Sequence, residues 1–200
     1  MSALTILHAS DLQCGRPFVP RAAEALVRFA RELEPDVIVI SGDLTQRAKP
    51  QEFMVAVELM KRLPDVPKIV TPGNHDVPVY RVFERMLMPY RNWRGYTGTE
   101  LNTVTRLPGA TFVSLNSSTP WAAIVAGRIE PSQVEFARRT FDECPSGDVR
   151  ALVIHHHFVP TADGTGGIPL PSAPELLAAF EAMHVDLILG GHVHRTHVHT

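Results

Sequence analysis

The sequence predicts an α/β fold of the α+β kind, whose sheet is mixed or divided in two, on three observations. Short apolar, β-branched runs alternate with stretches of helical periodicity. The first three runs lie about 30 residues apart, which is the length of one strand-helix-strand unit. Two later runs flank Pro108-Gly109 as the strands of a hairpin would, and this interruption argues against a purely parallel sheet.

Three strands with two helices between them are expected in the N-terminal part of the chain. Apolar and β-branched residues mark the strands, and apolar residues at helical spacing mark the helices. Pro20 opens the first helix and Pro35 ends it, because proline suits the first helical turn and cannot continue a helix. The second helix should turn Phe53, Val57 and Met60 toward the core. In chain order the elements are a strand at 4–9, a helix at 20–34, a strand at 36–41, a helix at 51–63 and a strand at 68–71.

The remainder of the chain is expected to hold a hairpin, further strands and further helices. One helical segment carries four arginines against a single glutamate, which we interpret as a solvated surface rather than a phosphate-binding site. The segment 160–171 is rich in glycine and proline and should form a long loop over the functional site. The elements are a helix and its exit at 78–93, strands at 104–107 and 110–115, a helix from 131, a strand at 151–154, a helix at 174–183 and a strand at 185–189.

Length and composition limit the classes of protein to which the chain can belong. Its 200 residues, 44% hydrophobic and 20% charged, fit one globular domain over residues 1–200. The formal net charge of -2 and the pI near 6.5 give no field that would gather nucleic acid or an anionic membrane. Two cysteines without a paired framework favour a reducing compartment. Because the sequence has neither a basic leader nor a run of about 20 apolar residues, we expect a cytoplasmic protein with no membrane partner.

The densest polar motif is Thr71-Pro72-Gly73-Asn74-His75-Asp76, which directly follows a predicted strand. Gly73 lets the backbone turn, and Asn74 offers a neutral oxygen that a metal ion can bind. His75 can give or take a proton near neutral pH. Asp76 can fix which ring nitrogen of His75 carries that proton. A loop of this composition suits chemistry better than packing, although by itself it is only a turn.

Polar side chains also follow the other predicted strands. They are Asp11, Asp43, His155, and His192 together with His194. Because the carboxyl ends of strands in an open α/β sheet lie along one edge, these side chains can meet the motif in one cleft. Eight of the ten histidines fall in the last 46 residues, and such clustering indicates a metal or catalytic site.

Five blocks in a fixed order carry a resemblance to a known family. They are Asp11 with Gln13, Gly42-Asp43, Gly73-Asn74-His75-Asp76, His155-His156 and Gly191-His192-Val193-His194. In this order they resemble the calcineurin-like metallophosphoesterase superfamily over nearly the whole chain. Three stretches are most similar to its bacterial cyclic-nucleotide phosphodiesterase branch, namely Ser41 to Thr45, Gly127-Arg128-Ile129 and His155-His156-His157.

The resemblance implies a two-layer mixed β-sandwich flanked by helices, with two divalent metal ions at the strand ends. Mixed oxygen and imidazole donors suit Mn, Fe, Zn or Co. Two such ions can share a hydroxide that attacks phosphorus. His75 would protonate the leaving oxygen or bind the phosphate, and Asp76 would orient His75. Carried over by motif, one metal would take Asp11, Asp43 and His194, and the other Asp43, Asn74, His155 and His192.

One position departs from the family pattern. The family has Asp-x-His where this chain has Asp11-Leu12-Gln13. Gln13 can lend an amide oxygen to a metal, but it is a weaker donor than imidazole and cannot relay a proton in the same way. We therefore expect a weaker first metal site, through looser binding, a preference for harder ions or vacancy at rest. The neighbouring Cys14 is interpreted as a small buried thiol rather than a ligand.

The remaining histidines leave alternatives open. His156 could replace His155 as the ligand, because a shift of one residue at a strand end is hard to exclude from sequence. His155 is preferred because it directly follows the strand, and His157 is assigned to a loop near the cleft. Positions around the metal ligands or at the surface are expected for His197 and His199, and structural roles in apolar surroundings for His8 and His184.

The function expected first is metal-dependent hydrolysis of a small phosphodiester or phosphomonoester. The alternative, which Gln13 favours, is a catalytically weakened module that keeps the fold and acts in protein binding or regulation. A nuclease is a third candidate, limited to short oligonucleotides because the charge is balanced and basic and aromatic residues do not interleave. Family members continue with further strands after His194, whereas this chain has only residues 195–200 there. The oligomeric state is therefore open, since a partner can complete such an edge.

Overall fold

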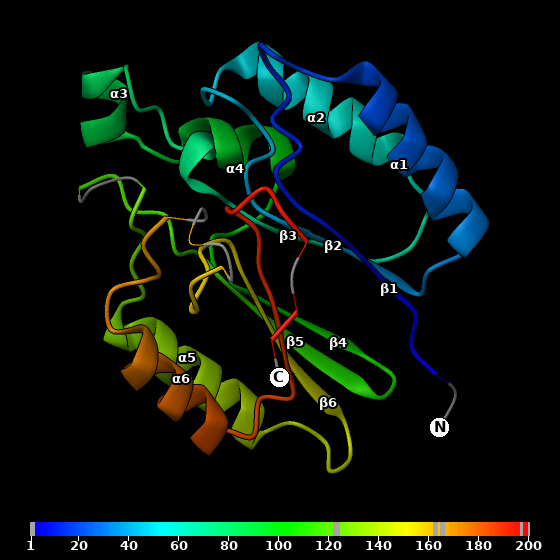
Figure 1. The fold of residues 1–200 in the computed structure, drawn as a ribbon, viewed down its shortest axis with the longest axis vertical. Coiled ribbons are helices and arrows are strands. Elements are labelled where there is room, and N and C mark those ends of the chain that lie inside the picture. The colour runs from blue at the N-terminus through cyan, green and yellow to red at the C-terminus, as the bar shows by residue number, and fades with distance from the viewer. Residues whose placement is uncertain (1–2, 122–124, 162–163, 165–166, 197, 200) are drawn as a thin grey trace.

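The fold consists of two β-sheets packed face to face, with helices on both outer sides (Figure 1). The structure is a computed structural model that describes residues 3–121, 125–161, 164, 167–196 and 198–199. Both sheets contribute to the apolar layer between them, which holds Val37, Val39, Ile69, Ala110, Phe112, Ala151 and Val153. The predicted two-layer mixed sandwich flanked by helices is therefore confirmed.

The first sheet is parallel, and two connecting helices cover its outer face. Its elements are β1 (Ile6–Ala9), α1 (Pro20–Leu33), β2 (Val37–Ser41), α2 (Pro50–Arg62) and β3 (Lys68–Thr71), with strand order β1-β2-β3. Alternate residues of β2 divide between the two layers. Ile38 and Ile40 belong to the cluster under the helices, whereas Val37 and Val39 face the second sheet. Every residue of this central strand is buried, because both of its faces are covered.

The second sheet is mixed, as the predicted hairpin requires. Its elements are β4 (Thr103–Leu107), β5 (Ala110–Leu115), α5 (Pro131–Asp142), β6 (Val149–Ile154), α6 (Ala173–Ala182) and β7 (Leu187–Leu189). The strands β4 and β5 pair antiparallel across Pro108-Gly109, and β6 and β7 then add in parallel. Helices α5 and α6 pack on Val113, Leu115, Leu152 and Ile154, so this sheet is also covered on its outer face.

The helix predicted at 78–93 is two short helices, α3 (Val82–Leu87) and α4 (Arg91–Thr97). Pro89 lies between them, and proline has no backbone N–H to donate and disfavours a helical residue before it. Helix α4 packs against α2, whereas α3 buries none of its residues and projects at one edge of the molecule (Figure 1).

The buried face of α2 differs in part from the prediction. Its buried residues are Phe53, Ala56 and Leu59. Val57 and Met60, which we expected to face the core, are only partly buried. The Phe53 ring accounts for this orientation, since it meets Trp93 edge-on at 6.4 Å and stacks on Tyr96 at 5.9 Å between centroids. Contact with α4 thus rotates α2 slightly about its axis, so its buried face differs from the one that the spacing of apolar residues predicts.

Two sequence-based expectations fall wholly or partly outside the described residues. They concern the predicted loop at 160–171 and the position of His197. Among the helices that the structure describes, none combines the length and apolar character needed to cross a bilayer. The assignment of residues 1–200 to a single domain stays a prediction.

Replacing Phe53 by alanine should lower the free energy of unfolding by about 3–5 kcal/mol, because the missing ring leaves a cavity between α2 and α4. Urea denaturation measures the change. The neighbouring Met54→Ala is the control, since Met54 is 55% exposed and its truncation should cost about 0.5 kcal/mol or less. Equal losses in the two variants would contradict the buried position of the Phe53 ring.

Candidate metal centre

The polar residues that follow the strands meet at one edge of the two sheets. The first sheet leads into Asp11, Asp43 and Asn74, and the second leads into His155 and His192. Side chains from the two sheets come within 3.0 Å of each other there, although they lie far apart along the chain. Topology, rather than local sequence, therefore assembles the site.

One set of donors is centred on the Asn74 amide oxygen. His155 Nε2 and His192 Nδ1 each lie 3.0 Å from Asn74 Oδ1, and Asp43 Oδ2 lies 3.5 Å from His155 Nε2. The other ring nitrogen of His155, Nδ1, donates to the backbone oxygen of Ser41 at 2.9 Å. In a neutral ring Nε2 then carries a lone pair, so it faces the amide and carboxylate oxygens as a third acceptor. We call Asp43, Asn74, His155 and His192 the inner group.

A second set of donors, which we call the outer group, consists of Asp11, Gln13, Asp43 and His194. His194 Nε2 lies 3.3 Å from Asp11 Oδ1 and accepts the side-chain amide of Gln13 at 3.0 Å. Ligand atoms of Asp11, Asp43 and His194 all lie within 4.8 Å of one another. The His194 side chain is 54% exposed, whereas that of His155 is fully buried. The outer group is therefore the more open of the two.

Two carboxylate oxygens of these groups are buried without a hydrogen-bond donor among the described residues. They are Asp11 Oδ1 and Asp43 Oδ2. Such an oxygen is costly to bury unless a positive charge lies near it. Carboxylate, amide and imidazole donors together match the ligand preferences of Mn, Fe, Zn and Co. The residues present therefore fit divalent metal ions.

The protonation of the inner group supports this fit. Burial raises the pKa of the Asp43 carboxyl above its ordinary value, and the His155 and His75 rings oppose that shift. Burial, followed by His155 and His157, lowers the pKa of His192 to about 4. Its ring is therefore neutral at pH 7, which is the form that binds a metal. A divalent cation would stabilise the ionised Asp43 carboxylate in the same position.

The backbone of the site is strained where it presents these side chains. Left-handed φ angles occur at five non-glycine site residues, Asp11, Gln13, Asp43, His192 and His194. Each such residue costs about 1–3 kcal/mol and persists only when its surroundings hold it. Two glycines leave space for the neighbouring site side chains. A Cβ on Gly73 would overlap the Asp43 carboxylate, and one on Gly42 would overlap the His155 ring. The glycines next to Asp43 and Asn74 are thus required by close approach.

The predicted relation between Asp76 and His75 is wrong. The Asp76 carboxylate accepts the backbone amides of Leu44, Thr45 and Gly73 and the hydroxyl of Thr45, at 2.9 to 3.1 Å. The His75 ring instead donates from Nδ1 to the backbone oxygen of Gln46 at 2.8 Å. The Asp76 side chain turns inward because it is the acceptor for donors of two neighbouring loops. Sequence reasoning missed Gln46, since a backbone carbonyl leaves no sequence signal.

His156 also reaches the inner group. Its ligand atom lies within 4.8 Å of those of His155 and His192. Ser117 Oγ lies 2.7 Å from His156 Nδ1 and holds the ring in place. The choice between His155 and His156 as the ligand therefore stays open, and Ser117 is a supporting residue that the sequence did not mark.

The structure also places Cys14 and the histidines that were not assigned as metal ligands. Cys14 is a buried free thiol, as expected, and burial is the main cause that raises its pKa to about 12. His157 is buried and stacks on His192 at 5.6 Å, near the site as predicted. His8 contacts the Ser41 hydroxyl at 2.8 Å, and His199 is exposed. The apolar setting predicted for His184 is wrong, because this residue is exposed beyond the end of α6.

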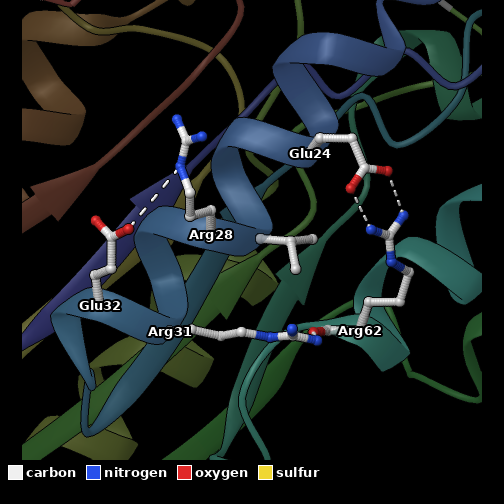
Figure 2. Close-up of a pocket in the computed structure, with 6 residues that line it drawn as sticks. Glu24, Arg28, Arg31, Glu32 and Arg62 are labelled. Atoms are coloured by element: carbon white, nitrogen blue, oxygen red, sulfur yellow. Dashed lines mark hydrogen bonds and ion pairs between the residues drawn. The ribbon is translucent and has the colours of Figure 1, made fainter.

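A separate hollow of about 290 Å³ lies on the outer side of the first sheet and is lined by α1 and α2 (Figure 2). Its arginines are already engaged: Arg62 pairs with both carboxylate oxygens of Glu24, and Arg28 pairs with Glu32. Arg31 donates to the backbone oxygen of Arg62. These exposed, paired charges do not resemble a catalytic centre, so the metal centre described above is the functional candidate.

Comparison with known proteins gives consistent results. The family model described as calcineurin-like phosphoesterase matches residues 4–196. The 3′,5′-cyclic adenosine monophosphate phosphodiesterase CpdA of Haemophilus influenzae is 27% identical over 166 residues, covering 81% of this chain and 56% of that protein. A probable cyclic nucleotide phosphodiesterase of Synechococcus sp. is 27% identical over 183 residues, covering 90% of this chain and 65% of that protein. The chain thus spans less than two thirds of either relative.

Solved structures support the fold. A dimetal phosphatase from Danio rerio superposes with a TM-score of 0.67 at 14% identity, covering 96% of this chain and 82% of that one. At this identity the likeness concerns the fold alone. The family match and the two curated relatives confirm the resemblance noted in the sequence, including that to the cyclic-nucleotide phosphodiesterase branch.

Asp76→Asn should lower the free energy of unfolding by about 2–3 kcal/mol, because its amide group would set a donor against backbone N–H donors. Urea denaturation measures the loss, and Asp142→Asn at the exposed end of α5 is the matched control, with an expected change of about 0.5 kcal/mol or less. Unchanged stability in Asp76→Asn would contradict the role of this carboxylate in joining the two loops.

Proposed function

Because the chain belongs to the calcineurin-like phosphoesterase family, we propose that it hydrolyses a small phosphodiester or phosphomonoester with the help of two divalent cations. The observation that carries this proposal is the convergence of acceptor atoms in the inner and outer groups. Asp11 Oδ1 and Asp43 Oδ2 are buried there without donors among the described residues. Carboxylate oxygens buried without donors destabilise an ordinary protein interior, whereas in a metal centre the bound cation stabilises them.

The two groups suggest a division of ligands between the cations. One cation would be held by Asp11, Asp43 and His194, with Gln13 beside them, and the other by Asp43, Asn74, His155 and His192. Asp43 belongs to both sets and would bridge them. Bound divalent cations of the Mn, Fe, Zn or Co type would supply a deprotonated water as nucleophile and neutralise the phosphate.

His75 is the residue of this chain best suited to proton transfer. Its Nδ1 donates to the Gln46 carbonyl at 2.8 Å, so Nε2 is the nitrogen that can take up and give a proton. Its backbone N–H donates to Asp43 Oδ1 at 2.8 Å. This bond ties the position of His75 to the carboxylate shared by both groups. We propose that the protonated His75 ring donates to the leaving oxygen or to a phosphate oxygen.

Gln13 supports a second candidate function. Its amide nitrogen donates to His194 Nε2 at 3.0 Å, and that nitrogen is the atom that would ligate the first cation. Where this hydrogen bond persists, the outer group cannot use His194 as a ligand. The chain would then be a catalytically weakened module of the same fold, acting in protein binding or regulation.

Activity toward bis-(p-nitrophenyl) phosphate in the presence of Mn²⁺, together with metal analysis, tests the first proposal. The wild-type chain should bind metal and release p-nitrophenolate. His75→Ala should reduce kcat by about 100- to 1,000-fold while bound metal is unchanged, because a proton donor is lost and no ligand is. His184→Asn is the control, since this exposed histidine lies beyond α6 at the far end of β7 and should leave kcat unchanged.

The possible results separate the two functions. A wild-type chain that neither binds metal nor turns over the ester would leave the binding or regulatory module as the explanation. Full activity in His75→Ala would remove this residue from the proposed chemistry without affecting the metal centre.

Gln13→His should raise affinity for the more weakly bound cation by about 10- to 100-fold, because imidazole replaces an amide that competes for His194. Titration with Mn²⁺, followed by electron paramagnetic resonance, counts sites and affinities independently of activity. Gln13→Ala serves as the control that removes the competing amide without adding a ligand. Equal affinities in wild type and Gln13→His would show that residue 13 does not limit the outer group.

A further inference from the structure

The segment that leaves the metal centre exposes an unusual amount of apolar surface. Tyr80 is 79% exposed, Phe83 84% and Leu87 75%. Val82, Met86 and Met88 are also exposed, and α3 buries no residue at all. Single exposed apolar side chains are ordinary, but a contiguous group of this size marks a surface that binds something.

Helix α3 is held in place by polar contacts rather than by packing. Arg81 pairs with Glu84 and also donates to the backbone oxygens of Arg47 and Ala48 at 3.0 and 2.9 Å. Arg85 donates through Nε to the backbone oxygen of Pro120 at 2.6 Å. The next residue, Trp121, is 64% exposed. These bonds fix the exposed helix beside the loop that follows β5, so the apolar surface extends from α3 to Trp121.

The charge of this segment differs from that of the whole chain. Residues 80–97 contain four arginines, one glutamate and neither aspartate nor lysine, although the chain as a whole has a formal charge of -2. Glu84 is engaged by Arg81 and Glu100 by Arg94, whereas Arg91 is exposed and takes part in no ion pair among the described residues. The surface therefore combines exposed aromatic and aliphatic side chains with excess positive charge.

We propose that Tyr80, α3 and Trp121 form a surface that docks on an anionic lipid bilayer. Aromatic and aliphatic side chains enter the boundary between headgroups and acyl chains, while guanidinium groups meet anionic headgroups. Arg81 and Arg85 already spend hydrogen bonds within the chain, so they add positive charge to the surface rather than directional contacts. Such charge suits the diffuse anionic surface of a bilayer better than the fixed acceptors of a protein partner.

Docking in this way would bring the metal centre close to the headgroup layer. The chain passes from Asp76 to Tyr80 in four residues, so the two regions are adjacent along the chain. Net charge and the lack of a spanning segment led to the expectation of no membrane partner, but neither quantity describes a local surface. The proposal concerns binding alone and does not rest on phosphoester hydrolysis.

Co-sedimentation with vesicles tests this surface. The chain should bind vesicles made of equal parts phosphatidylcholine and phosphatidylglycerol, and bind phosphatidylcholine vesicles far less. Binding should fall as salt is added, since the attraction of exposed charges is screened. The double variant Phe83→Glu/Leu87→Glu should reduce the partition coefficient by about tenfold or more, because two apolar contacts are replaced by repelled charges. Arg91→Gln should reduce it by about fivefold.

Phe29→Glu on α1 is the control, because Phe29 is likewise an exposed phenylalanine, at 53%, but lies on the outer side of the first sheet. It should bind vesicles as the wild type does. A wild-type chain that ignores anionic vesicles at low salt overturns the proposal, and so does equal binding by the double variant and the control. Wild-type self-association that the double variant abolishes, without vesicle binding, would assign the surface to a second copy of the chain instead.

Discussion

The structure depends on one electrostatic constraint, the burial of the Asp43 carboxylate among other acceptor atoms. Its Oδ1 accepts the His75 backbone N–H, and its Oδ2 lies opposite His155 Nε2 without a donor. The Asn74 amide oxygen is within hydrogen-bond distance of the same ring nitrogen. Lone pairs so close together repel unless a positive charge lies between them, and burial makes that repulsion stronger. The surrounding chain must therefore be rigid enough to hold them there.

That rigidity comes from the Asp76 carboxylate, whose hydrogen bonds go to loop donors rather than to these acceptor atoms. Asp76 binds backbone amides of Leu44, Thr45 and Gly73, so it joins the loop after β2 to the loop after β3. Burial and the charge of Asp43 raise its pKa to about 7, against the effect of these hydrogen bonds. The strained φ angle at Asp43 and the close approach of Gly73 are tolerable because this joint fixes both loops.

The sequence allowed the strands, the two-sheet core and the meeting of Asp11, Asp43, Asn74, His155, His192 and His194 to be predicted, because apolar periodicity and strand ends are local signals. It did not reveal that Asp76 turns away from His75, since the competing donors come from the neighbouring loop. The Gln46 carbonyl was equally hidden, because every residue has one. The orientation of α2 depends on rings of α4, and such tertiary contacts override a spacing rule when they involve a side chain as large as Phe53.

The inner and outer groups differ in ways that would make two bound cations inequivalent. The inner donors are largely buried, and the Ser41 carbonyl fixes the tautomer of His155. These side chains would therefore lose little conformational entropy on binding a cation. The outer donors include the half-exposed His194, whose ligating nitrogen must first give up the Gln13 amide. A cation entering the outer group would therefore replace an existing hydrogen bond, whereas one entering the inner group would relieve the repulsion between lone pairs. The two groups thus differ in their hydrogen bonding before any cation binds. This difference, more than the identity of the ligands, would make the inner position the first to fill.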